Sequence, residues 1–129
     1  MNYTSIEQSK QLIEAGLDPN TADMSFYDGI PQLDSYKFNK LHEELMGRTN
    51  IEVLPCWSIG ALIELMPHAI NTYWLCITKT TLGNNVIDYM KTNGEELFTS
   101  DKKERLIDAA FETIRWLLEN NYIEKGETK

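Results

Sequence analysis

Apolar residues recur at intervals of three and four along the last third of the chain, between Ser100 and Ile123. On a helix of 3.6 residues per turn this spacing places them on one stripe, which predicts a helix packed against a core. The stripe consists of Ile107, Ala110, Phe111, Ile114, Leu117 and Leu118. Asp101 followed by Glu104 predicts a capping box at the start of this helix, and Asp101 also suits the positive end of the helix dipole.

Two shorter helices are predicted in the first half of the chain. Thr4 and Glu7 match a capping box ahead of the first helix, and Gly16 supplies the left-handed residue that ends it. The apolar positions of the first helix are Ile6, Leu12 and Ile13. The second helix is predicted from Leu33 to Met46. Its apolar side consists of Phe38, Leu41 and Leu45.

The segment from Leu54 to Pro67 is bracketed by prolines and predicts a short central helix. The side chain of Ser58 can accept the hydrogen bond that opens such a helix, and Pro67 cannot continue it. Nearly every side chain between these two residues is apolar. The central helix is therefore expected to be buried on most of its sides.

The clearest strand signals lie in the second half of the chain. The segment Thr72–Lys79 is rich in aromatic and β-branched residues, and both of its alternating sets are largely apolar, which predicts cover on both faces of the sheet. Val86–Lys91 is predicted to return as a second strand, and Asn93-Gly94 predicts a hairpin that leads into a third strand at Glu96–Thr99. A further short strand is predicted at Met24–Tyr27.

These elements predict an α+β fold, in which a small antiparallel sheet of two to four strands packs against the long C-terminal helix and shorter N-terminal and central helices. The length of 129 residues suits a single domain covering residues 1–129, with a polar tail from about residue 124. The first residues, MNYTSIEQSK, lack a basic patch followed by an apolar run, and no apolar run approaches the roughly 20 residues of a membrane span. We therefore expect a cytoplasmic protein that does not enter membranes.

The charge balance bears on the partners that the chain can have. Twelve Lys and Arg against 20 Asp and Glu give a formal net charge of −8. A field of this sign repels phosphate backbones, so direct binding to nucleic acid is disfavoured. The same charge leaves open an acidic protein that imitates DNA and inhibits a nucleic-acid-binding protein.

Few residues suggest catalytic or metal chemistry. His42, Cys56, His68 and Cys76 include no C-x-x-C or H-x-x-x-H pair, so no metal site is expected. The chain also lacks glycine-rich phosphate loops and the spaced carboxylates of a calcium loop, so no cofactor is expected. Cys56 precedes the predicted central helix, where the helix dipole lowers the pKa of a thiol. A small cysteine-dependent enzyme with a histidine base is therefore one alternative.

The C-terminal helix carries a second stripe, small and aromatic, roughly opposite its apolar one. This second stripe consists of Ala109, Thr113, Trp116 and Asn120. A helix with two usable faces is either sandwiched inside the protein or shared with a partner. Sandwiching would place Trp116 against the N-terminal helix or against the segment from Pro31 to Met46. Sharing would make the stripe an interface with a protein partner or in a homodimer, because exposed tryptophan tends to anchor interfaces.

Three blocks of the chain are distinctive as strings. They are TSIEQSKQLIEAGLDPNTADM near the start, LPCWSIGALIELMP in the middle and LIDAAFETIRWLLENNYI at the end. In these blocks the chain resembles short uncharacterised proteins carried by prophages and conjugative elements of anaerobic gut bacteria. The resemblance implies a mobile-element setting and an α+β fold, and it brings no catalytic residues. We expect a non-catalytic accessory protein of a phage or mobile element that acts by protein–protein interaction.

Overall fold

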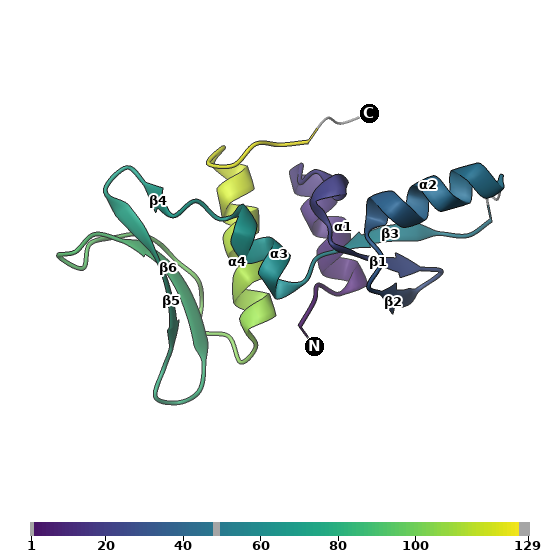
Figure 1. The fold of residues 1–129 in the computed structure, drawn as a ribbon. Helices are drawn as coiled ribbons and strands as arrows, with labels where there is room; N and C mark the ends of the chain where they lie inside the picture. Colours follow the sequence, from purple (N-terminus) through teal and green to yellow (C-terminus); the bar gives the residue numbers. More distant parts are fainter. Residues whose placement is uncertain (1, 48–49, 127–129) are drawn as a thin grey trace.

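The computed structural model describes residues 2–47 and 50–126 and has the α+β fold predicted from the sequence (Figure 1). In chain order the described elements are α1 (Ile6–Ala15), the 3-10 turn η1 (Pro19–Thr21), β1 (Met24–Tyr27), β2 (Ile30–Gln32), α2 (Tyr36–Met46), β3 (Val53–Cys56), α3 (Ile59–Leu65), β4 (Ala69–Ile70), β5 (Tyr73–Lys79), β6 (Asn85–Met90), β7 (Glu96–Thr99) and α4 (Leu106–Glu119). The strands form a three-stranded sheet in the order β2-β1-β3 and a four-stranded sheet in the order β4-β5-β6-β7. Both sheets are antiparallel.

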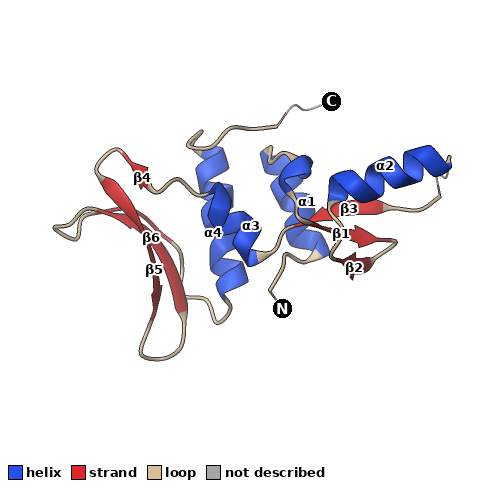
Figure 2. Ribbon diagram, viewed as in Figure 1, coloured by secondary structure: helices blue, strands red, loops and turns tan. Residues whose placement is uncertain are grey.

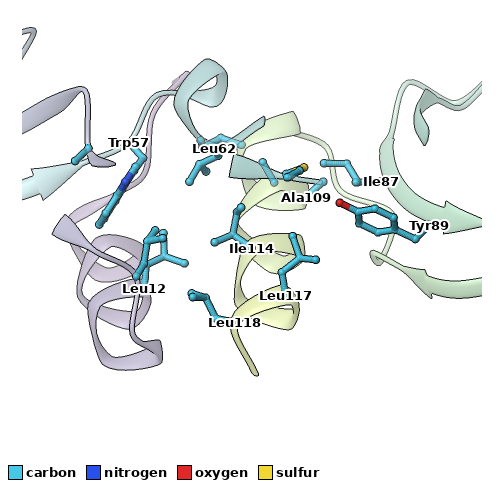
Figure 3. Close-up of a cluster of buried hydrophobic side chains, with 14 of the residues drawn as sticks. Leu12, Trp57, Leu62, Ile87, Tyr89, Ala109, Ile114, Leu117 and Leu118 are labelled. Atoms are coloured by element: carbon cyan, nitrogen blue, oxygen red, sulfur yellow. The ribbon is translucent and has the colours of Figure 1, made fainter. Parts of the chain in front are cut away.

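Helix α4 lies at the centre of the fold, between the four-stranded sheet on one side and helices α1 and α3 on the other (Figure 2). The three-stranded sheet and α2 lie beyond α1, at the opposite end from the four-stranded sheet. Side chains of α4 fill the space between Leu12 and Trp57 on one side and Ile87 and Tyr89 on the other (Figure 3). The core therefore runs along α4 and is closed by a sheet on one flank and by helices on the other.

The apolar stripe predicted for α4 is buried in this core. Its residues Ile107, Ala110, Ile114, Leu117 and Leu118 are at most 1% exposed. Phe111, the remaining member, is half-buried and packs against the edge of the cluster. The helical spacing in the sequence thus identified the side of α4 that packs against the rest of the protein.

The capping box predicted at Asp101 and Glu104 is wrong, because α4 begins only after Arg105, whose side chain makes no capping hydrogen bond. The residues before α4 are engaged in a long-range pairing instead. Asn85 and Lys103 exchange two backbone hydrogen bonds, at 2.6 and 3.1 Å, and so form an isolated bridge to the start of β6. This pairing overrides the local capping signal.

The N-terminal helix begins one residue later than predicted. Its capping box is formed by Ser5 and Gln8 rather than by Thr4 and Glu7. The hydroxyl group of Thr4 is buried and accepts a hydrogen bond from the backbone N–H of Trp57 at 3.1 Å. Thr4 is therefore used to join the N-terminus to the segment before α3.

Two other helix boundaries are confirmed. Gly16 ends α1 in the left-handed region, at a φ of 106°. Ser58 is the N-cap of α3 and its hydroxyl accepts a hydrogen bond from the backbone N–H of Ala61. Within α3, Leu62 is fully buried and the remaining apolar side chains are half-buried, because the helix contacts α4 on one side.

The strands β5, β6 and β7 match the three predicted segments closely, but the prediction that both faces of β5 are covered is wrong. Ile87 and Tyr89 lie on the face of the sheet that packs on α4, and both are fully buried. Trp74 pairs with Met90 and so lies on the opposite face, where it is 56% exposed. Only one face of the four-stranded sheet is therefore covered by α4.

Two findings concern membranes and the end of the chain. Within the described residues, no helix is both long and apolar enough to cross a membrane. The polar tail is predicted to start at about residue 124. Within it, Gly126 donates its backbone N–H to the carbonyl group of Gly16 at 2.8 Å. Residues 127–129 lie outside the described residues.

Candidate functional site

Helix α2 packs on the three-stranded sheet through its polar side. Asn39 and Glu43 point toward β1 and are each only 4% exposed. The amide group of Asn39 donates a hydrogen bond to the hydroxyl group of Ser25 at 2.6 Å, and Ser25 in turn donates to the backbone carbonyl of Asp34 at 2.7 Å. The hydroxyl group of Tyr27 donates to the carboxylate of Glu43. This polar network fixes which side of α2 faces the sheet, because buried polar groups are costly unless they are paired.

The apolar side of α2 consequently faces solvent. We call it the outer face of α2, and it consists of Phe38 (58% exposed), Leu41 (53%), Leu45 (78%) and Met46 (57%). His42 lies beside it, with its ring stacked on that of Phe38 at a centroid distance of 6.4 Å. Amphipathic helices usually turn such a stripe into the core. Here the arrangement is inverted, and a contiguous apolar stripe lies on the surface.

Further apolar surface lies near α2, beyond its outer face. Ile30 pairs with Tyr27 in the sheet, so its side chain lies on the same face of the sheet that α2 covers, and it is exposed. Leu33, in the connection from β2 to α2, is exposed as well. A groove of about 370 Å³ adjoins the helix between α1 and β3. Its mostly apolar lining includes Ile13, Tyr36 and Leu54.

The second stripe of α4, predicted as an interface, lies against other parts of the same chain. Ala109 and Thr113 are fully buried, and the hydroxyl group of Thr113 donates to the carbonyl group of Ala109 at 2.8 Å. Trp116 is half-buried, and Asn120, which is exposed, donates its amide N–H to the carbonyl group of Trp116 at 2.9 Å. Of the four residues, only Trp116 and Asn120 reach the surface of the monomer.

Trp116 contacts three aromatic rings, of which that of Tyr89 is the most distant, at a centroid distance of 6.1 Å. It stacks on Phe98 of β7 at a centroid distance of 4.4 Å and meets Tyr122, beyond the end of α4, at 5.2 Å. Trp116 is thus covered by the four-stranded sheet and by the segment after α4. The sandwich hypothesis instead predicts cover by the N-terminal helix or by residues 31–46. The use of this stripe as an interface stays a prediction.

Cys56, the candidate nucleophile, lies in an environment that suppresses its reactivity. The thiol is fully buried and donates a hydrogen bond to the carbonyl group of Thr4 at 3.5 Å. Burial raises the pKa of Cys56 to about 11, and the nearby carboxylate of Asp23 contributes in the same direction. The possible bases His42 and His68 are both exposed, on α2 and after α3. A nucleophilic cysteine needs the opposite conditions, a lowered pKa and an adjacent base.

This environment predicts that Cys56 does not react with a thiol reagent in the folded protein. At neutral pH a pKa near 11 instead of 9.0 lowers the thiolate fraction about 100-fold. Reaction of Cys76→Ser with a disulfide reagent should therefore be at least about 100-fold slower in buffer than in denaturant at the same pH, and should rise about tenfold per pH unit until it levels off near pH 11. Rapid reaction of the folded variant at neutral pH would contradict this and revive the enzyme alternative.

Two observations bear on metal binding and on DNA mimicry. Across residues 2–47 and 50–126, no three His, Cys, Asp or Glu side chains are grouped so that they would hold a metal ion. Along α4 the carboxylates are paired with bases and do not form a row of unpaired negative charges. The pairs are Arg105–Asp108, Lys103–Glu112 and Arg115–Glu119. An inhibitor that imitates DNA needs carboxylates spaced along a surface like phosphates.

Comparisons of the chain with protein-family models, with curated proteins and with solved structures found no match. The candidate site therefore rests on the geometry of this structure. The outer face of α2 is the feature that sequence analysis missed. Helical spacing identifies Phe38, Leu41 and Leu45 as one side of a helix. The sequence signal for an apolar side that faces solvent is the pair of polar residues on the opposite side, Asn39 and Glu43.

Proposed function

We propose that this protein is a non-catalytic accessory protein that binds another protein through the outer face of α2. The observation that carries the proposal is the inverted packing of this helix, with Asn39 and Glu43 buried and Leu41 and Leu45 exposed. Contiguous apolar surface on a small domain is typical of protein–protein contact sites. Each large apolar side chain that a partner buries fully contributes about 1.5–3 kcal/mol to association.

The polar network beneath α2 strengthens this proposal. A helix held loosely on a sheet can rotate to hide its apolar side, but here rotation breaks the hydrogen bonds of Ser25 with Asn39 and of Tyr27 with Glu43. Breaking such buried bonds costs about 1–3 kcal/mol for each unsatisfied group. The outer face is thus presented in a fixed orientation before a partner arrives, which reduces the ordering cost of binding.

The setting that we propose for this contact is a phage or other mobile element, which rests on the sequence blocks described above. In such a setting, the chain would act on its partner by direct contact. Direct binding to nucleic acid is not part of the proposal, because a net charge of −8 disfavours it. Neither the cysteine-enzyme nor the DNA-mimic alternative is favoured by a specific observation.

The test is co-purification from a lysate of an anaerobic gut bacterium, with tagged wild type and the double variant Leu41→Glu/Leu45→Glu compared by mass spectrometry. Both substituted positions are exposed, so the variant is expected to fold and to lose a bound partner because the apolar contact becomes charged. Leu82→Glu, in the exposed turn between β5 and β6, is the matched control and should retain the partner.

Two outcomes would contradict the proposal. A partner that both α2 and Leu82 variants retain equally would show that binding uses another surface. The absence of any protein bound specifically by the wild type, including a second copy of the chain, would argue against a function by protein–protein interaction.

A further inference from the structure

We propose that the outer face of α2 binds the outer face of α2 in a second copy of this chain, with the two helices antiparallel about a two-fold axis. This inference rests on the proposed function, because it names the partner of the same surface. The charged residues that border the apolar stripe favour pairing between two copies.

Lys37 and Glu44 are both exposed and lie along the same edge of the outer face of α2. They are seven residues apart, which is two turns, so they share one flank of the helix and stand about 10 Å apart along its axis. Lys37 is in the first turn and Glu44 in the last. Leu41 lies near the midpoint between them.

An antiparallel two-fold arrangement turns this pattern into complementary charge. The two-fold axis passes near Leu41. It lies in the plane of contact between the two helices and is perpendicular to both of them. The charged flanks of the two helices therefore lie on the same side of the contact. Lys37 then lies opposite Glu44 of the second copy, and Glu44 lies opposite Lys37 of the second copy. A parallel arrangement would instead place each charged flank opposite His42 and Met46, where no opposite charge is available. The pattern therefore selects the antiparallel pair.

The size of the surface sets the expected strength. An 11-residue helix is about 16 Å long, so a contact made mainly by α2 buries less than the roughly 800 Å² per partner of a standard interface. We expect a dissociation constant on the order of 10 µM. The net charge of −8 on each copy opposes association, but at physiological ionic strength charges more than about 8 Å apart are largely screened.

The test is sedimentation equilibrium of the full chain at physiological salt, over concentrations that bracket the expected dissociation constant. Wild type, Lys37→Glu and Glu44→Lys are measured separately, and the two variants are then measured as an equimolar mixture. Each single variant places like charges opposite each other twice in the dimer and is expected to associate about tenfold more weakly than wild type. In the mixture, one chain has Glu at both positions and the other has Lys at both, so mixed pairs should associate as strongly as wild type.

Misfolding does not explain the expected loss in the single variants. A carboxylate in the first turn and an ammonium group in the last turn both interact favourably with the helix dipole, so each substitution stabilises α2. Weak association by each variant with recovery in the mixture supports the inference. A wild type that stays monomeric overturns it, and so does a mixture that associates no better than its components.

The failure of this inference is distinguishable from failure of the proposed function. If wild type is monomeric, and yet a lysate protein is lost from Leu41→Glu/Leu45→Glu and kept by Leu82→Glu, the outer face of α2 binds a different protein. The proposed function then stands and self-pairing does not. If wild type dimerises and both single variants dimerise equally well, the second copy is held by another surface.

Discussion

Replacing Trp57 by alanine is expected to lower the free energy of unfolding by about 3–5 kcal/mol, the cost typical of removing a buried aromatic side chain. Trp57 follows β3 and is fully buried in the core cluster. Its indole N–H donates a hydrogen bond to the hydroxyl group of Thr21 at 2.9 Å. The substitution therefore leaves a large cavity and removes a polar contact between two segments. A loss of this size is a large part of the roughly 5–15 kcal/mol that stabilises a typical domain.

Urea unfolding followed by far-ultraviolet circular dichroism measures this loss. Trp74→Ala is the matched control, because Trp74 lies on the open face of the four-stranded sheet and is 56% exposed. Its removal is expected to change the free energy of unfolding by about 0.5 kcal/mol or less. Equal losses for the two tryptophans would show that Trp57 does not hold the central position that the structure gives it.

Replacing Asn39 by alanine is expected to lower the free energy of unfolding by about 1–3 kcal/mol, even though alanine is the better helix former. The substitution removes the amide group that donates to the fully buried hydroxyl group of Ser25. Urea unfolding is again the measurement. Lys40→Ala, the exposed next residue of α2, is the control and should change the free energy by about 0.5 kcal/mol or less. Equal stability of Asn39→Ala and wild type would show that the polar network does not hold α2.

Local sequence signals predicted the elements whose formation depends on near neighbours. The period of the apolar residues gave the buried side of α4, and Asn93-Gly94 gave the hairpin between β6 and β7. Gly16 and Ser58 gave two helix boundaries, because a left-handed residue and a capping hydroxyl act within one turn.

Long-range pairing decided the elements that the sequence signals missed. Strand β3 is four residues long, contains Pro55 and, among the described strands, pairs with β1 alone, at the edge of its sheet. Proline is tolerated in an edge strand because the N–H that it lacks is not required there. In a sequence, however, proline argues against a strand. The bridge between Asn85 and Lys103 likewise moved the start of α4 beyond Asp101.

The candidate site was harder to predict than the fold, because helical spacing shows which side of a helix is apolar and does not show what covers it. For α4 the apolar stripe packs on the core, whereas α2 packs on β1 through the polar pair Asn39 and Glu43. Hydrogen-bond partners on β1 make this inversion favourable, and Ser25 and Tyr27 lie in a strand that the helical pattern does not include. Trp116 shows the same limit, since its cover comes from Phe98 of β7.

The outward orientation of the apolar side of α2 underlies the proposed function, and the free energy of unfolding of Leu45→Ala tests it most directly. The measurement is made at low protein concentration, so that association does not contribute to stability. We predict a value within about 0.5 kcal/mol of wild type, because the Leu45 side chain is 78% exposed. A loss of about 2–5 kcal/mol, typical of a buried leucine, would contradict the account, since the apolar stripe would then be packed inside the protein and unable to bind a partner.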